Sequence, residues 1–307
     1  MSLALAVLPL LLIIATGHVL ARSGVVPRAD WAGIETLSFR LLIPAVLILA
    51  ILRSDLSWET FGPFMLCLMA SFGLLVALLL GLRLLPRARL SDPAFTSVFQ
   101  SGLRWNAFVA LAAAEQFTGP EGLGAIAVAI ALLIPAINVT CIGVLSAFGP
   151  ARATARGVLG MVARNPLVQA CALGLALRFA GLPLPAPVET ALDMVGRGAL
   201  AVGLLAVGAG VSLRRLARWD LPLGLALAMR PLIAPLVFVG VAWAVGLPGV
   251  LTFAGVLVFA APTASNGYIV ARQMGGDADL YADVLTWQVL VSLAVLPLWA
   301  WALLGGA

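Results

Sequence analysis

Apolar residues occur along this chain in long continuous runs, and polar residues fall mostly in the short stretches between them. A helix needs roughly 20 apolar residues to cross a bilayer core about 30 Å thick. Ten runs of this kind, bounded by proline, glycine and arginine, can be placed end to end. The pattern predicts an all-α integral membrane protein with ten spans, at 3–21, 34–52, 61–82, 94–114, 121–148, 165–180, 187–212, 222–246, 249–273 and 280–304.

Composition supports this prediction. The 307 residues are 63% hydrophobic and 10% charged, whereas soluble domains are about 25% charged. The net charge of +5 is carried by arginines between apolar runs and not by one basic face, which disfavours a nucleic-acid partner. We interpret the first run as a retained span, because a signal peptide carries its positive charge before the apolar segment, whereas Arg22 and Arg28 follow it.

The arginines are distributed unevenly between the two predicted sides. One side has only Arg53 and Arg178 in its loops. Cytoplasmic loops are enriched in Arg and Lys, so the richer side is expected to face the cytoplasm and both termini to lie outside an inner (plasma) membrane. The richer side holds Arg22, Arg28, Arg83, Arg87, Arg89, Arg152, Arg156, Arg164, Arg214, Arg215, Arg218 and Arg272.

The chain also matches itself at an offset of 157 residues. Matching pairs are Pro9 and Pro166, Gly17 and Gly174, and Arg40 and Arg197. The repeat predicts a first five-helix unit at 1–150, a cytoplasmic linker at 151–164 and a second unit at 165–307. Because each unit has an odd number of spans, the second is inverted, as in secondary transporters that bind substrate near the midplane on discontinuous helices.

Spans four and nine occupy equivalent places in the two repeats and contain residues that interrupt helices. Pro262 removes a backbone donor, and Thr263, Ser265 and Asn266 are cap-type residues. The offset places Asn106 of span four opposite Thr263. We therefore expect both helices to break, near 104–107 and 262–266, and to cross there. Unwound backbone within a membrane is tolerated where it lines a cavity, and freed helix N-termini favour anions.

Arg104 is the only charge expected near the midplane, and its guanidinium can hold a carboxylate by two hydrogen bonds. An alternative role for it is to satisfy carbonyls of the broken helix. Asn138 fits either the site or helix–helix packing. Arg230 is followed by Pro231 and Pro235 in span eight and could reach cytoplasmic water as a residue of the transport path. Arg197 has Asp193 one turn away, and this pair is interpreted as structural. The predicted substrate-binding residues are Arg104, Asn106, Asn138, Pro262, Thr263, Ser265 and Asn266, with no catalytic residue, metal or cofactor.

With these residues assembled, the chain resembles the auxin efflux carrier family, specifically bacterial members that transport malonate or related organic acids. The resemblance rests on segments in spans two, five, six, seven and nine, namely 42–46, 135–138, 165–167, 204–209 and 262–268. It implies ten spans in two inverted repeats, as in sodium–bile acid symporters, with crossing helices four and nine, a scaffold part, a moving part and a homodimer. The residues after Asn106 lack the Gly and Pro of many members, so auxin is not carried over as substrate.

Other functions have less support in the sequence. An enzyme needs a nucleophile with a base or a metal cluster, and the single histidine lies near a helix end. A sodium- or proton-coupled carrier needs carboxylates beside the crossing, whereas Glu115, Glu121, Asp277, Asp279 and Asp283 lie near span ends. A channel or receptor remains an alternative. The sequence favours a secondary transporter of a small organic anion, auxin- or malonate-like, in a lipid bilayer.

Overall fold

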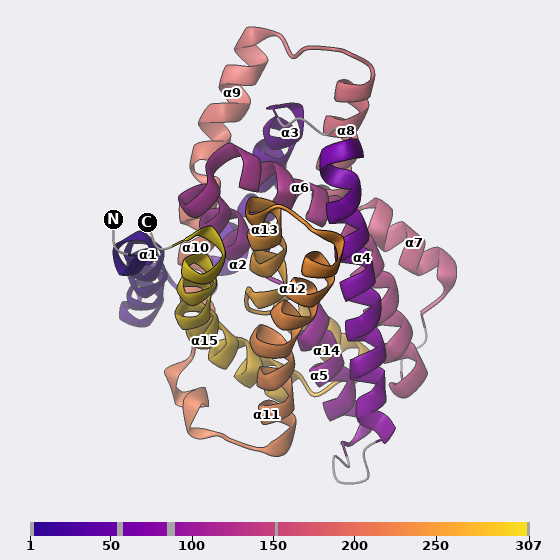
Figure 1. Ribbon diagram of the computed structural model, residues 1–307. Coiled ribbons are helices and arrows are strands. Elements are labelled where there is room, and N and C mark those ends of the chain that lie inside the picture. Colours follow the sequence, from indigo (N-terminus) through magenta and orange to yellow (C-terminus); the bar gives the residue numbers. More distant parts are fainter. Residues whose placement is uncertain (1–2, 54–57, 85–89, 151–152, 306–307) are drawn as a thin grey trace.

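The computed structural model describes residues 3–53, 58–84, 90–150 and 153–305, and within them it contains helices and no strand (Figure 1). Arg87, Arg89 and Arg152, counted above among the cytoplasmic arginines, lie outside the described residues. The first half consists of α1 (Leu3–Ser23), α2 (Trp31–Leu37), η1 (Ser38–Leu42), α3 (Ile43–Arg53), α4 (Trp58–Gly81), η2 (Leu82–Leu84), α5 (Asp92–Leu103) and α6 (Ala107–Phe148).

The second half follows with shorter pieces, because prolines and glycines interrupt its apolar runs. Asn165 caps α8 by accepting hydrogen bonds from two backbone N–H groups of the first turn. The elements are α7 (Ala155–Ala163), α8 (Pro166–Phe179), α9 (Ala186–Arg197), α10 (Ala199–Gly210), η4 (Leu213–Ala217), α11 (Leu221–Leu227), η5 (Ala228–Ile233), α12 (Ala234–Val245), α13 (Gly249–Ala260), α14 (Asn266–Met274) and α15 (Ala278–Leu304).

By length and apolar composition, six helices within the described residues can cross a membrane, or seven if the bent pair α7–α8 forms one span. This number is below the ten predicted spans because the apolar helix Leu8–Ser23 is shorter than a full span, and for two further physical reasons. One counted helix runs over 57 residues from Asp92 to Phe148, although Gly119 turns the backbone sharply within α6 with φ of 61° and ψ of −144°. In addition, the break after Ala260 leaves α13 too short to be counted.

The helices pack in two groups that meet along α6. In one group α1 lies against α10, and α3 lies against α8 and α9; in the other, α12 and α13 pack with α4, α6 and α15. The contact between α1 and α10 is very close, since a Cβ at Gly17 would lie 2.0 Å from the backbone oxygen of Leu205. Small residues that let helix backbones approach are typical of membrane helix pairs.

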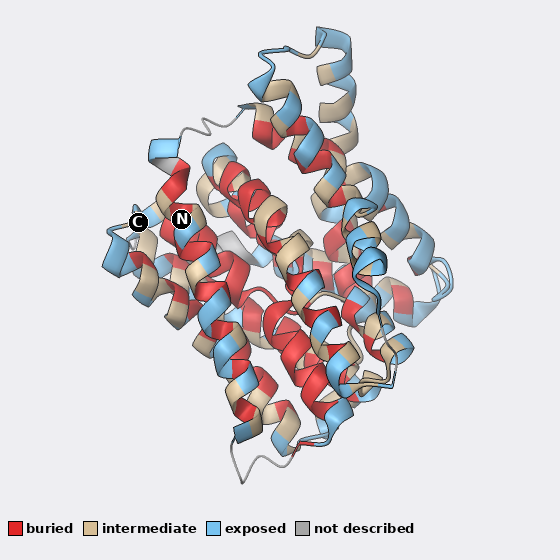
Figure 2. Cartoon of the chain, turned by 90° about the vertical axis from the view of Figure 1, so that its right-hand side faces the viewer, coloured by how far each residue is buried: buried red, intermediate tan, exposed pale blue. Residues whose placement is uncertain are grey.

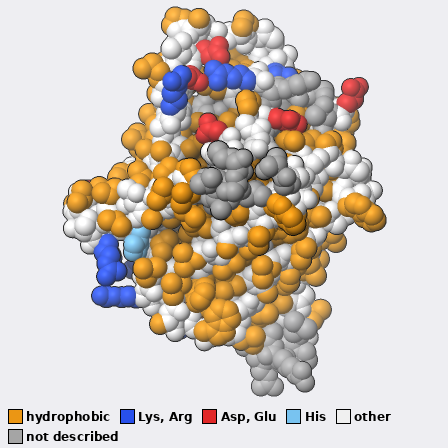
Figure 3. Space-filling model, turned by 60° about the vertical axis from the view of Figure 1, so that its left-hand side comes forward, with side chains coloured by type: hydrophobic (Ala, Val, Ile, Leu, Met, Phe, Trp, Pro, Cys, Tyr) orange, Lys and Arg blue, Asp and Glu red, His pale blue; other side chains and the backbone are white. Residues whose placement is uncertain are grey.

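Burial divides the molecule into an interior and an apolar exterior. The second half of α5 and nearly all of α13 are buried, and exposed residues lie on the outward faces of the surrounding helices (Figure 2). Large apolar side chains such as Trp58 and Trp243 are exposed. Hydrophobic side chains cover most of the face in Figure 3, and charged side chains gather near its upper end and left edge. Such a surface is suited to lipid.

Candidate functional site

Both predicted helix interruptions are confirmed. Helix α5 ends at Leu103 and α6 begins at Ala107, while α13 ends at Ala260 and α14 begins at Asn266. The two interruptions touch, because the backbone N–H of Asn106 donates to the carbonyl of Pro262 over 2.8 Å. We call the region around this contact the crossing.

Asn106 and Thr263, both predicted to bind substrate, are engaged within the protein. The Asn106 side-chain oxygen caps α6, accepting hydrogen bonds from the N–H groups of Phe108 and Val109 at 3.0 and 3.3 Å. The Thr263 hydroxyl lies 2.6 Å from the hydroxyl of Tyr281. Tyr281 in turn donates to the carbonyl of Ala264. These two side chains therefore order the interrupted backbone in this structure.

Ser265 and Asn266 lie at the start of α14 and are less enclosed. Ser265 is half-buried and its side chain makes no capping hydrogen bond. Asn266 is exposed. The N-terminus of α14 is thus uncapped by a side chain, and it presents the positive end of a helix dipole.

Arg104 lies in the first interruption and is 4% exposed. Its Nε donates to the side-chain oxygen of Gln100, and its Nη1 donates to the side-chain oxygen of Asn138, each over 3.0 Å. The structure thus joins two predicted site residues, Arg104 and Asn138. Arg104 Nη2, Gln100 Nε2 and Trp105 Nε1 are buried donors without a hydrogen-bond partner among the described residues.

A second buried arginine, Arg230, corrects two sequence predictions. Arg230 is fully buried, so it does not reach cytoplasmic water, and Arg104 is not the only charge at the crossing. The guanidinium of Arg230 donates to the carbonyls of Gly102 and Leu103 at the end of α5. It also donates to carbonyls at the end of α13, those of Val258 and Ala261, at 2.8 and 2.9 Å.

Arg230 therefore has the role that the sequence offered as the alternative for Arg104, that of satisfying the carbonyls of broken helices. Each helix C-terminus carries about half a negative charge, and two of them together balance one guanidinium. The side chain reaches this position because the backbone at Arg230 is not helical, with φ of −133° and ψ of 126°. Pro231 gave the only local signal of this irregularity.

Polar residues of α15 complete the crossing and were missed by sequence reasoning. Gln288 accepts from the N–H of Thr263 at 2.9 Å and donates to the carbonyl of Arg230 at 3.0 Å. Ser292 donates to the carbonyl of Ala260 at 2.7 Å. Tyr281, Gln288 and Ser292 are seven and four residues apart, which places them on one face of α15. That spacing was the available signal.

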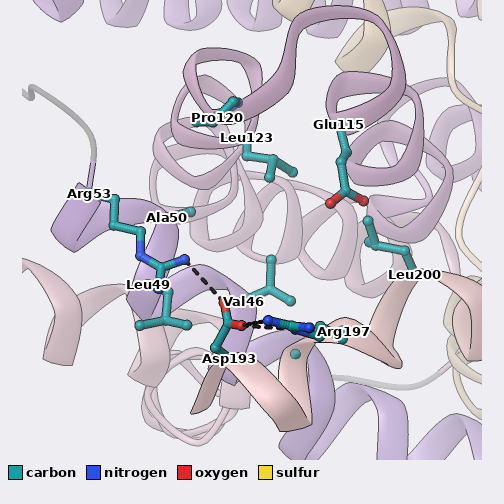
Figure 4. A pocket seen from close by; sticks show the side chains of 11 residues that line it. Val46, Leu49, Ala50, Arg53, Glu115, Pro120, Leu123, Asp193, Arg197 and Leu200 are labelled. Atoms are coloured by element: carbon teal, nitrogen blue, oxygen red, sulfur yellow. Dashed lines mark hydrogen bonds and ion pairs between the residues drawn. The ribbon is translucent and has the colours of Figure 1, made fainter. Parts of the chain in front are cut away.

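A cavity of about 250 Å³ lies apart from these residues, between α3, the first part of α6, and α9 with α10 (Figure 4). Asp193 forms ion pairs there with Arg53 at 3.2 Å and with Arg197 at 2.7 Å, so the predicted pair of Arg197 and Asp193 is confirmed. Glu115 points into the cavity from α6, opposite Arg197 (Figure 4). The cavity thus has both charged and apolar walls.

No curated protein matches the chain. Residues 151–300, which make up most of the second half, match the model of a family described as membrane transport protein. Three of the five segments on which the sequence resemblance rests, 165–167, 204–209 and 262–268, lie within the matched residues. The second half of this chain is therefore similar to membrane transport proteins.

Proposed function

We propose that this protein is a secondary transporter that moves a small organic anion across the membrane by alternating access, with Arg104 as the main contact for a carboxylate. The observation that carries the proposal is the free Nη2 of a buried guanidinium that pairs with no carboxylate among the described residues. A buried charge without a counter-ion costs several kcal/mol. A bound carboxylate offsets this cost.

Arg104 and Arg230 divide two tasks between them. Arg230 donates to four backbone carbonyls, which leaves Arg104 as the arginine with a free donor for a ligand. The N-termini of α6 and α14 lie at the same interruptions and add positive dipole ends. Together these groups favour a negative ligand over a cation, which supports an anion carrier over a sodium- or proton-coupled antiporter.

The helix boundaries support an inverted repeat as the framework for this transport. The 157-residue offset carries the bounds of α5, Asp92 and Leu103, onto Gly249 and Ala260, which are the bounds of α13. The same offset carries Arg53, the end of α3, onto Gly210, the end of α10. The interruptions in spans four and nine thus begin at equivalent positions.

Helix packing supports the same framework. Gly17 of α1 faces Leu205 of α10. Its equivalent at the 157-residue offset, Gly174 of α8, faces Ile51 of α3, whose side chain would lie 3.2 Å from a Cβ at position 174. Span one therefore packs on span seven as span six packs on span two. Repeats related in this way rock against each other to expose a midplane site alternately to the two sides.

Several finer features belong to the same proposal. The arginine asymmetry supports an inner (plasma) membrane location with both termini outside. The resemblance favours a malonate-like or related carboxylate as substrate and a homodimer as the assembly. In the proposed arrangement of ten spans, α5 and the start of α6 form span four, and α13 and α14 form span nine.

Two measurements test the function. A thermal-shift screen of the purified protein against mono- and dicarboxylates should reveal a stabilising ligand, because a ligand selective for the native state raises its stability. Uptake of that labelled acid into proteoliposomes, measured beside passive ion conductance in the same vesicles, separates a carrier from a channel. Stabilisation by no carboxylate in the series, or anion conductance without saturable uptake, would contradict the proposal.

A further inference from the structure

We infer that the 250 Å³ cavity is the vestibule of the transport path and that Phe108, packed on Gly203, is the seal that separates this vestibule from Arg104. The inference rests on the proposed function, since it assigns a route to the anion site. Its evidence lies in the positions of cavity residues and of one close contact between the two groups of helices.

The cavity lies where the two groups of helices meet. Glu115 belongs to α6, and Asp193 and Arg197 belong to α9, on the other side of the cavity (Figure 4). Arg197 is 79% exposed, so the cavity opens outward near this residue. The charged groups on its facing walls make the cavity hydrophilic.

Going inward, both walls lead to one contact. On α10, Gly203 follows the cavity residue Leu200 by three positions, about one turn. On α6, Phe108 precedes Glu115 by seven positions, about two turns or roughly 10 Å. A Cβ built at Gly203 would lie 1.8 Å from Cδ1 of Phe108. The ring thus fills the space that any larger residue at position 203 would occupy.

Phe108 also lies next to the proposed anion site. Its N–H donates to the cap residue Asn106 at 3.0 Å, two positions after Arg104. The ring is half-buried, whereas Arg104 is 4% exposed. The ring thus packs on Gly203 at one turn from the cavity residue Leu200, and its residue follows Arg104 by four positions. On the proposed route this side chain has to move before the anion can pass.

The buried thiol of Cys141 provides a reporter for this seal. Cys141 is fully buried and follows Asn138, the partner of Arg104 Nη1, by about one turn on the same face of α6. In the full-length chain with Cys67→Ala and Cys171→Ala, Cys141 is the only thiol left. Its rate of modification therefore measures access of water-borne reagents to the surroundings of Arg104.

The experiment measures modification of Cys141 by 2-sulfonatoethyl methanethiosulfonate, a small anion, with purified protein in detergent micelles and mass spectrometry as readout. Phe108→Ala should raise the rate at least tenfold. The matched control is Phe64→Ala, which removes an equally large ring from a fully buried position in the contact of α4 with α12. It should leave the rate unchanged.

A second pair of variants changes the glycine side of the contact and leaves the Phe108 ring in place. Gly203→Ala should raise the rate because the added methyl group displaces the ring, whereas Gly240→Ala, which adds a methyl group in open space, should not. Equal rates within both pairs, or fast modification with Phe108 and Gly203 intact, would overturn the inference. Labelling needs no transport, so loss of the proposed function alone would appear as absent carboxylate uptake with the labelling pattern preserved.

Discussion

Substituting the two buried arginines with glutamine separates a ligand contact from a structural one. Arg104→Gln removes the charge and the free Nη2 but keeps an amide that can donate toward Gln100 or Asn138. Arg230→Gln leaves at most two donors for four backbone carbonyls. The same chemical change is thus made at two positions with different surroundings.

The expected magnitudes follow from these contacts. A hydrogen bond between charged groups contributes about 1.5–3 kcal/mol, and about 1.4 kcal/mol corresponds to a factor of ten in affinity. Arg104→Gln should therefore weaken carboxylate binding roughly 10- to 150-fold with little change in the melting temperature of the ligand-free protein. Each buried carbonyl left unpaired costs about 1–3 kcal/mol. Arg230→Gln should therefore lower that melting temperature strongly, by the loss of about 2–6 kcal/mol.

The assay combines titration calorimetry with the best carboxylate from the thermal-shift screen and melting curves of both ligand-free variants. Arg104→Lys adds a third point, because it keeps the charge but loses the planar arrangement of donors that matches a carboxylate. Its affinity should fall between those of the wild type and Arg104→Gln. Wild-type binding by Arg104→Gln, or a lowered melting temperature for it with Arg230→Gln unchanged, would refute the assigned roles.

Three other predictions concern packing, the site and topology. Gly17→Leu should lower the melting temperature by several degrees, because its Cβ meets a backbone oxygen of α10 at 2.0 Å, whereas Gly143→Leu, in open space, should not. Asn138→Ala should weaken carboxylate binding about tenfold, or roughly 1.4 kcal/mol, because the guanidinium of Arg104 loses the partner that orients it, and unchanged calorimetric affinity would contradict this. The variant Gly157→Cys should react in intact cells with a membrane-permeant maleimide but not with an impermeant one. Labelling by the impermeant reagent would contradict the predicted cytoplasmic location of this loop.

The sequence predicted well what depends on residues close together along the chain. Apolar runs, Pro262 and the cap-type residues around it identified both interruptions within a few residues, because capping and the loss of a backbone donor act within one turn. The pair of Asp193 and Arg197 was predictable for the same reason, as the two residues lie four positions apart on one helix.

The remaining features of the site depend on contacts between distant segments. Arg230 meets Leu103 across 127 positions, and no local pattern shows that its guanidinium serves two other helices. The sequence identified Asn106 as a polar residue at the break. Whether its side chain caps α6 or is free to bind a ligand depends on the residue at which α5 ends. Whether the seven predicted residues contact substrate remains a prediction.

The bonds from Arg230 also constrain how the protein is made. Gly102 and Leu103 are synthesised long before Arg230, which follows Leu103 by 127 residues, and at about 5–20 residues per second the delay is roughly 6 to 25 s. During this time the end of α5 lacks its final hydrogen-bond donor, and unpaired carbonyls are costly within lipid. The nascent first half therefore cannot complete the hydrogen bonding of this helix end until Arg230 has been synthesised.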